Sequence, residues 1–294
     1  MAPGMPAVRA IQAAQALAAA ALALVLLPGS LRAGEKAPVS LPPEVSAEAE
    51  VLAHPMMGEE TRTLVVRFPE PRRLLSTRLG FAERTAVMNH GAPISVWNRV
   101  CGRDGRGYER TAVADAARRS GLAPESAAYL STAADIRNLA VTTESFEGVA
   151  VVALVTAGAR TNAQRAGVDR GDFVEWKTAP REARPLQSRR SGAGTVNVIL
   201  LTNARLKDEA MARVLITATE AKVAAFEDMN VPSSYTPGEQ ATGTGTDEIV
   251  VVSGTGPVVT CAGGHCRFGE MAARAVKRAV EEGLRKQSGF ERRP

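Results

Sequence analysis

A chain of 294 residues, 45% hydrophobic and 23% charged, is long enough for one large domain or two small ones with a sizeable core. The net charge is +5, and the basic residues are scattered except in a cluster between Lys177 and Gly194. That cluster could touch phosphates, but no nucleic-acid-binding signature or set of stacking aromatic residues accompanies it. We therefore interpret it as a solvated loop and expect no nucleic-acid partner.

The first 33 residues have the layout of a secretory signal peptide. Arg9 precedes an apolar run from Ala13 to Leu27, and Pro28 and Gly29 end that run. The run is shorter than the ~20 residues that a membrane-spanning helix needs. The pattern predicts a signal peptide at residues 1–33 and a periplasmic or secreted protein. The alternatives are an uncleaved membrane anchor, the sole membrane contact that we expect, and a cytoplasmic protein.

Residues 34–60 are rich in proline, alanine and glutamate, which indicates a linker. A strand is expected at Thr61–Phe68, and further strands between Leu74 and Val100, with "MNHGAP" forming a turn. A short helix is expected at Thr111–Ser120. The stretch "STAADIRNL", residues 131–139, has helix-start residues, with Asp135 in its first turns.

The second half of the chain shows stronger periodicity. Near-continuous apolar runs predict buried strands, and longer amphipathic stretches predict helices. The expected strands are Val149–Thr156, Thr195–Thr202 and Glu248–Gly254, and the expected helices are Leu206–Met229 and Phe268–Lys286. We expect an α/β fold, with a layered α+β arrangement as the alternative: a mixed β-sheet with packed helices in a single catalytic domain, residues 61–287, followed by a tail, residues 288–294.

A loop of small and hydroxylated residues, "ATGTGTDE", precedes the last of these strands. Phosphate-cradling loops follow a strand and open a helix, whereas this loop follows a helix and opens a strand, so a nucleotide site is disfavoured. Either the small residues allow a ligand to approach closely, or the hydroxyls satisfy their own backbone. The candidate residues are Thr242, Gly243, Thr244, Gly245, Thr246 and Asp247.

Lys222 falls in the middle of the apolar stripe of the helix expected at Leu206–Met229, whereas Glu220 falls on the opposite face. A lysine in that position must find a carboxylate, extend its ammonium to solvent or lose its proton. Both a structural ion pair and a functional site are compatible with this pattern.

The stretch "CAGGHCRFGE", residues 261–270, repeats the small-residue theme before the last helix. The backbone amides of Gly263 and Gly264 could hold a carbonyl oxygen, and His265 could act as an acid or base. The alternative is a simple helix-entry turn. Cys261 and Cys266 could form a disulfide if the glycines fold the loop back, or they could remain free thiols.

A metal site is not expected. The three histidines are not paired in sequence, and the three cysteines cannot supply a cysteine quartet. A serine nucleophile is not indicated either, because no G-x-S-x-G motif occurs.

Several motifs in one order resemble the adenosylcobinamide amidohydrolase family. The matching stretches are "TAGARTNAQRAG" from Thr156, "GTVNVILLTNARL" from Gly194, "ATEAK" from Ala218, "ATGTGTDEIVV" from Ala241 and "GGHCRFGE" from Gly263. A looser match extends the resemblance to roughly residues 50 to 287. The signal-like N-terminus and the two cysteines around "AGGH" depart from what the family leads us to expect.

The resemblance implies hydrolysis of the amide that joins aminopropanol to a corrinoid side chain. The products would be adenosylcobyric acid and 1-amino-2-propanol, as in the salvage of incomplete cobamides. No cofactor is implied, because the corrinoid substrate carries its own cobalt. The rival hypothesis is a non-catalytic exported corrinoid-binding protein, and either hypothesis allows a functional link to corrinoid uptake.

Amide hydrolysis needs a nucleophile, an oxyanion donor and an acid for the leaving amine. In the light of the resemblance, Asp247 or Glu220 would position the nucleophile, and His265 would protonate the amine. Thr244 or Thr246 is the alternative nucleophile. Lys222, Asn197, Gly263 and Gly264 would support the oxyanion. The remaining expected substrate-binding residues are Asn162, Thr195, Thr242, Gly243 and Gly245.

Overall fold

The computed structural model describes residues 31–96, 105–171 and 194–292, and the side chains from residue 111 onward in helix α3. The expected signal peptide and the basic cluster before Gly194 therefore fall largely outside the described residues. Among the residues that the structure describes, no helix is both long and apolar enough to cross a membrane.

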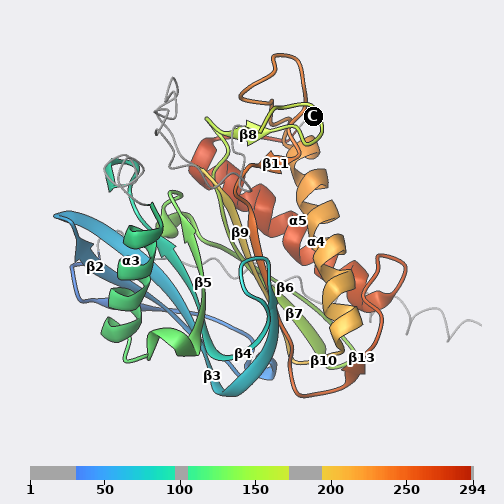
Figure 1. Ribbon diagram of the computed structural model, residues 1–294. Helices are drawn as coiled ribbons and strands as arrows, with labels where there is room; N and C mark the ends of the chain where they lie inside the picture. The colour runs from blue at the N-terminus through green and yellow to red at the C-terminus, as the bar shows by residue number, and fades with distance from the viewer. Residues whose placement is uncertain (1–30, 97–104, 172–193, 293–294) are drawn as a thin grey trace, which may run out of the picture.

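A nine-stranded mixed sheet forms the centre of the molecule (Figure 1). Its main path runs β1-β2-β3-β12-β9-β7-β6, and β4 and β5 branch from β3. The strands β12 and β9 are parallel, whereas β9 and β7 are antiparallel. The bounds are Lys36–Val39 (β1), Glu48–Met56 (β2), Glu59–Ser76 (β3), Gly80–Gly91 (β4), Ala127–Thr132 (β5), Ala140–Phe146 (β6), Val149–Ala157 (β7), Val196–Thr202 (β9) and Glu248–Val252 (β12).

The long strand β3 lets this sheet fold back on itself. Its register against β4 shifts between Arg67 and Arg72. The part before this shift pairs with β2, and the part after it pairs with β12. Residues of both halves, such as Leu64 and Leu130 on one and Leu154 and Ile199 on the other, pack into one buried cluster. The sheet therefore forms two facing layers with an apolar core between them.

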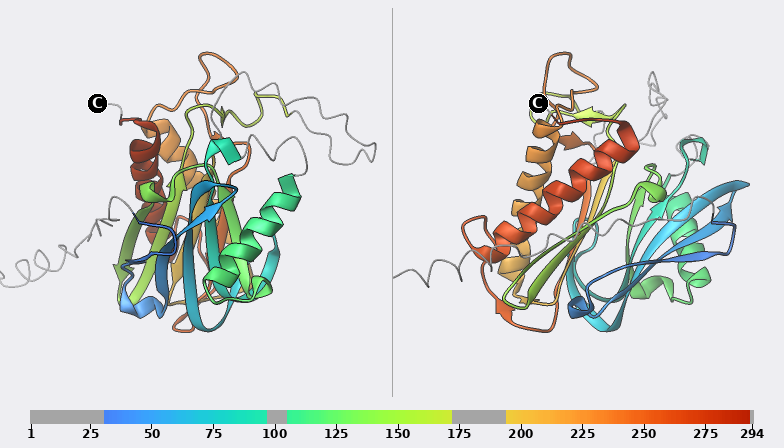
Figure 2. Two further views of the ribbon diagram at one scale, coloured as in Figure 1. Left: turned by 90° about the vertical axis from the view of Figure 1, so that its left-hand side faces the viewer. Right: turned by 180° about the vertical axis from the view of Figure 1, so that it is seen from behind.

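Helices cover the outer face of each layer (Figures 1 and 2). Helices α4 (Asp208–Asp228) and α5 (Arg267–Ser288) pack on β7, β9 and β12 through a cluster that includes Met211, Phe226 and Val276. Helix α3 (Gly105–Arg119) packs against β4 and β5, where Ala116 meets Met88. These helices bury their apolar stripes against the sheet, as amphipathic helices do.

Short elements complete the chain. They are the 3-10 helices Pro43–Val45, Pro124–Ser126 and Ile136–Asn138 and the two-residue strands β8 (Ala163–Gln164), β10 (Arg205–Leu206), β11 (Gly243–Thr244) and β13 (Val258–Val259). The pair β8–β11 is antiparallel, and the pair β10–β13 is parallel.

The predicted α/β fold with a mixed sheet and packed helices is confirmed, but three local predictions are wrong. Residues 34–60 are not a linker, because they supply β1 and β2, whose alternate side chains are buried. The stretch "MNHGAP" was expected to form a turn, but its first four residues lie within β4. There they pair with β3 on one side and with β5 on the other. Ser131, expected at a helix start, belongs to β5. Asp135 is the N-cap of a single 3-10 turn, Ile136–Asn138.

Candidate active site

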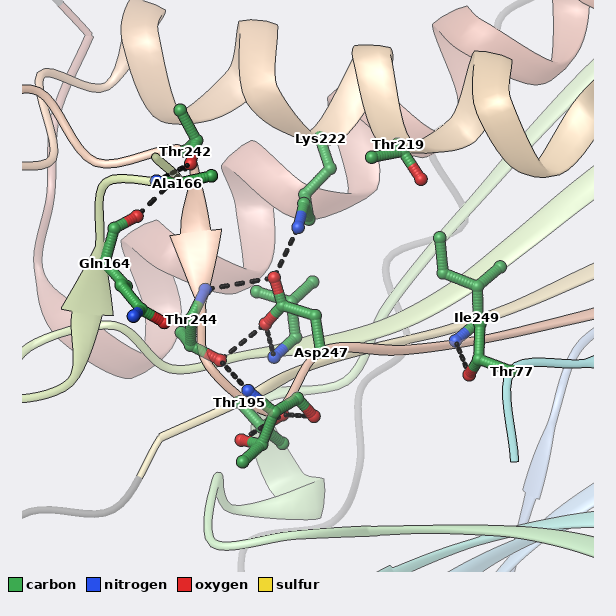
Figure 3. Close-up of polar contacts among 12 residues, drawn as sticks. Thr77, Gln164, Ala166, Thr195, Thr219, Lys222, Thr242, Thr244, Asp247 and Ile249 are labelled. Atoms are coloured by element: carbon green, nitrogen blue, oxygen red, sulfur yellow. Dashed lines mark hydrogen bonds and ion pairs between the residues drawn. The ribbon is translucent and has the colours of Figure 1, made fainter. Parts of the chain in front are cut away.

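The candidate site lies where the central strands β9 and β12 begin, at one end of the sheet's strands. Because the two strands are parallel, their N-terminal ends meet there, with Asn197 opposite Glu248. The preceding residues, Thr195 and Asp247, therefore lie close together, and α4 passes above them (Figure 3).

Asp247 is the centre of the polar contacts. Its Oδ2 accepts hydrogen bonds from the Lys222 ammonium and from the Thr244 amide, the latter at 3.0 Å. Its Oδ1 accepts from the Val196 amide at 3.0 Å and from Thr244 Oγ1 at 2.5 Å. Four donors around one carboxylate fix its orientation.

Lys222 points from α4 toward the sheet and is 9% exposed. The sequence left three outcomes for such a lysine: a carboxylate partner, an ammonium that extends to solvent, or loss of its proton. The structure pairs it with Asp247. A Cβ at Gly243 would overlap both the Lys222 ammonium and Asp247 Oδ2. The glycine at this position therefore allows the loop backbone to lie directly against the buried ion pair.

The three threonines of the loop differ in their hydrogen-bond partners. Thr244 donates its hydroxyl to Asp247. Thr246 is exposed and donates to Thr195 Oγ1 at 3.1 Å, and Thr195 in turn donates to the Thr246 carbonyl at 2.7 Å. Thr242 accepts from the Ala166 amide at 3.0 Å, and its own amide donates to Gln164. Of these hydroxyls, Thr244 is the one that donates directly to a carboxylate.

A second segment, residues 158–166, braces this loop. Strand β8 pairs with β11, so that Gly243 lies opposite Gln164. A Cβ on the exposed Gly245 would approach the Gln164 side chain to 2.9 Å. The side-chain amide of Asn162 donates to the Gly194 carbonyl, directly before Thr195. These contacts fix the position of the loop relative to the start of β9.

The opposite face of the same strand ends carries a second polar group, which the sequence analysis missed except for Asn197. Asn197 Nδ2 donates to Asn89 Oδ1 at 2.9 Å and to the Ser131 carbonyl at 3.0 Å. Glu248 Oε2 accepts from the Ser131 amide at 3.3 Å, and Arg78 pairs with its other oxygen. Asn197 and Glu248 thus bind the backbone of the edge strand β5 and join the two layers.

Strand alternation was the pattern that could have revealed this second group. In "TDEIVV" the side chains of Asp247 and Glu248 must point to opposite faces of the sheet. Each face therefore receives one carboxylate at the start of the strand. Asn89 could not be found in this way because it was assigned to a turn.

Other expected site residues lie elsewhere. Glu220 is exposed on α4, on the side away from the sheet. Gly263, Gly264 and His265 lie just before α5, where Gly263 approaches Arg213. Arg213 and Lys222 are about 13 Å apart along the helix axis at the usual helical rise. The structure therefore does not bring the 263–265 turn to Asp247.

Among the described residues, no group of three or more histidine, cysteine, aspartate or glutamate side chains is placed to hold a metal ion. The chemistry available around Asp247 is that of a hydroxyl, a carboxylate and an ammonium in contact.

The model of the adenosylcobinamide amidohydrolase family matches residues 44–292. The chain belongs to this family. A protein of Methanocaldococcus jannaschii, described as uncharacterized, is 46% identical over 236 residues, which is 79% of this chain and 89% of that protein. The adenosylcobinamide amidohydrolase of Methanosarcina mazei is 34% identical over 105 residues, 32% of this chain and 48% of that protein.

Two solved structures share a distant similarity. A protein of Pyrococcus horikoshii OT3 gives a TM-score of 0.35 at 14% identity, covering 77% of this chain and 78% of that one. The L-aminopeptidase D-Ala-esterase/amidase of Ochrobactrum anthropi, described as a variant of the Ntn hydrolase fold, gives 0.37 at 13% identity, covering 82% and 83%. These scores are low, and the fold described above rests on the strand pairing.

Proposed function

We propose that the protein hydrolyses the aminopropanol amide of adenosylcobinamide, releasing adenosylcobyric acid and 1-amino-2-propanol. Membership of the amidohydrolase family over residues 44–292 supports this reaction class. The observation that carries the mechanism is the contact of Thr244 Oγ1 with Asp247 Oδ1 at 2.5 Å, beside the Lys222 ammonium.

In this proposal Thr244 is the nucleophile. A hydroxyl that donates to a carboxylate, with a third group orienting that carboxylate, is the general arrangement of an activated nucleophile. Thr244 Oγ1 would attack the amide carbonyl carbon while its proton passes to Asp247. The leaving aminopropanol nitrogen would then take up this proton, and water would hydrolyse the resulting ester.

Lys222 would hold the carbonyl oxygen as negative charge develops on it. In the described structure the ammonium is paired with Asp247 Oδ2. A substrate carbonyl that attracts the ammonium would weaken this pairing and leave Asp247 Oδ2 free to interact with the proton of Thr244. Binding of the correct amide and activation of Thr244 would thereby be coupled.

The corrinoid would lie over the loop around Gly245 and Thr246, both of which are exposed. Glycine lets a ligand approach the backbone closely, and the threonine hydroxyls and backbone groups can bind the amide arms of the macrocycle. The proposal needs no added metal or nucleotide. Glu220 and His265 have no role in it, since they lie away from Asp247.

A matched pair of substitutions tests the nucleophile. Thr244→Ser keeps the hydroxyl and should retain measurable release of aminopropanol, whereas Thr244→Val, similar in shape, should lose about 10²-fold or more. Intact-mass analysis of rapidly quenched wild-type protein should show a corrinoid adduct, and peptide mapping should place this ester on the peptide that contains Thr244. Full activity of Thr244→Val would show instead that Asp247 activates water directly.

We also propose export to the periplasm or the exterior, on the basis of the apolar run after Arg9, with a cytoplasmic location as the alternative. A non-catalytic corrinoid-binding protein that assists uptake is the rival function, and it would require neither Lys222 nor Thr244.

A further inference from the structure

Two cysteines and a histidine share the loop between β13 and α5. Cys261 is exposed, and its Sγ lies 3.7 Å from His265 Nε2. Cys266, the N-cap residue of α5, donates its thiol to the Cys261 carbonyl at 3.2 Å and to the Gly263 carbonyl at 3.0 Å. Both cysteines are free thiols in the structure. The proposed amide hydrolysis uses none of these groups.

The surroundings of Cys261 favour its thiolate. A hydrogen bond from the Gly263 backbone lowers the pKa of the Cys261 thiol, and the Cys266 side chain and the positive charge of Arg213 act in the same direction against partial desolvation. His265 Nε2, when unprotonated, can accept the thiol proton. The thiolate is the reactive form of cysteine, so an exposed thiol in this setting reacts faster than an ordinary one.

Cys266 is placed to complete a disulfide. Its thiol lies 3.2 Å from the Cys261 carbonyl, so the two cysteines are neighbours in space. A Cβ built on Gly264 would meet open space, so no other residue packs against that side of the turn between the two cysteines. Gly269, by contrast, packs tightly against the Gly263 carbonyl and fixes the start of α5 beneath the loop.

We propose that Cys261 and Cys266 form a reversible thiol–disulfide couple that reacts with hydroperoxides, with Cys261 as the attacking thiol and Cys266 as the resolving thiol. The first step forms an S–O bond on Cys261 and breaks the O–O bond of the hydroperoxide. Sulfur is oxidised to sulfenic acid, and the peroxide is reduced to water or an alcohol, which takes up the thiol proton.

In the second step the Cys266 sulfur attacks the sulfenic sulfur. The S–S bond forms, the S–O bond breaks, and the departing hydroxyl leaves as water with the Cys266 proton. A dithiol reductant returns both residues to thiols by exchange. This couple is independent of the proposed amide hydrolysis, because the loop contacts the N-terminal half of α4, through Thr217, rather than the Asp247 site.

The test uses the full chain with Cys101→Ser, which leaves Cys261 and Cys266 as its cysteines. One equivalent of hydrogen peroxide, with EDTA present, should produce a monomer lighter by two hydrogen atoms, and dithiothreitol should reverse this change. Adding Cys266→Ser should trap a sulfenic acid that dimedone labels at Cys261. Adding Cys261→Ser instead should slow the reaction on the order of tenfold or more.

His265→Gln should slow oxidation of Cys261 without changing the melting temperature, and Arg274→Gln, an exposed change further along α5, serves as its control. The proposal is overturned if peroxide yields only oxygen adducts or covalent dimers. Equal rates for the Cys261→Ser and Cys266→Ser proteins would overturn it as well, since they would show that Cys261 has no special reactivity.

Discussion

The buried ammonium of Lys222 explains the unusual composition of the loop from Ala241 to Asp247. The loop backbone approaches the Lys222–Asp247 pair so closely that a side chain at Gly243 would overlap it. The hydroxyl and amide of Thr244 then complete the shell of donors around Asp247. Gly243 must therefore be small because it lies against the ion pair. Gly245 and Thr246, by contrast, are exposed.

Lys222→Met keeps the length of the side chain and removes its charge. We expect a folded protein with amide hydrolysis reduced about 10²-fold or more, because the developing oxyanion loses its cation. Removing one partner of a buried ion pair also costs about 3–5 kcal/mol where the remaining charge is left unpaired. Here three other donors still bind Asp247, so we expect a smaller loss in the free energy of unfolding.

Urea unfolding and release of aminopropanol measure the two effects of Lys222→Met separately. Glu220→Gln removes a charge from the exposed side of the same helix and should change neither quantity. A Lys222→Met protein as active and as stable as the wild type would rule out any role for this ammonium.

Gly243→Ala tests the close approach of the loop. The added methyl group must displace the Lys222 ammonium or the loop, so we expect both the melting temperature and the rate of hydrolysis to fall. Gly264→Ala is the matched control, because its new methyl group meets open space. Equal behaviour of the two variants would contradict the described packing.

The residues of the site could be predicted only in part. The position of Lys222 on an apolar stripe required a carboxylate partner, an ammonium that extends to solvent or a lost proton. The helical pattern does not say which outcome holds or which of several carboxylates the partner is. Asp247 is 25 residues away in the chain, and only the strand order brings it beneath α4. Helical periodicity alone cannot supply such a contact.

At the scale of elements, strands β2, β3 and β4 carry a buried polar row beneath α3. His54 Nε2 lies 3.0 Å from Thr63 Oγ1, which lies 3.0 Å from His90 Nδ1. Burial lowers the pKa of His90 to about 3 and that of His54 to about 4, with the positive charge of Arg119 adding to the effect at His54 and Asp115 opposing it.

These histidines predict a loss of stability in mild acid. In the unfolded chain a histidine takes up a proton below its ordinary pKa of 6.5, whereas the folded protein holds His90 neutral down to about pH 3. The free energy of unfolding should therefore fall as the pH drops below about 6.5, by up to about 1.4 kcal/mol per pH unit for each such histidine.

Urea unfolding between pH 7 and pH 4 measures this dependence. His90→Gln has no such proton to bind and should flatten the decline by about the contribution of one histidine. An unchanged slope in His90→Gln would mean that His90 is protonated in the folded protein.

The elements with strong periodicity were predicted well, and those with mixed composition were not. The buried strands β7, β9 and β12 and the helices α4 and α5 were expected within a few residues of their observed bounds. Strands β1 and β2 were missed because Pro38 and Pro55 and the many glutamates resemble a linker in composition, although alternate side chains are buried. Composition averages over the two faces of a strand and hides that alternation.

At the scale of the whole molecule, two facing sheet layers with helices outside place the candidate site at the N-terminal ends of the central strands β9 and β12. The apolar interior between the layers gives way there to Asn89, Asn197 and Glu248, while Asp247 faces α4. The layered form could be anticipated from buried strands and amphipathic helices. The folding back of the sheet could not, because it depends on the irregularity within β3 between Arg67 and Arg72.

The N-terminal segment predicts that the mature chain begins near Gly34. The apolar run after Arg9 suits export and removal. Sequencing the N-terminus of the protein purified from its native host should give a start close to this residue. Intact Met1 on a protein recovered from the cytoplasmic fraction would refute the prediction of export.

The central claim is that this member of the amidohydrolase family cleaves adenosylcobinamide. The decisive measurement is incubation of the EDTA-treated, desalted protein with adenosylcobinamide, followed by mass spectrometry of both products. We predict adenosylcobyric acid and free 1-amino-2-propanol in equal amounts, with Asp247→Asn binding the corrinoid but releasing little amine. Tight binding by the wild-type protein with no amine released over hours would contradict the claim and favour a corrinoid-binding role.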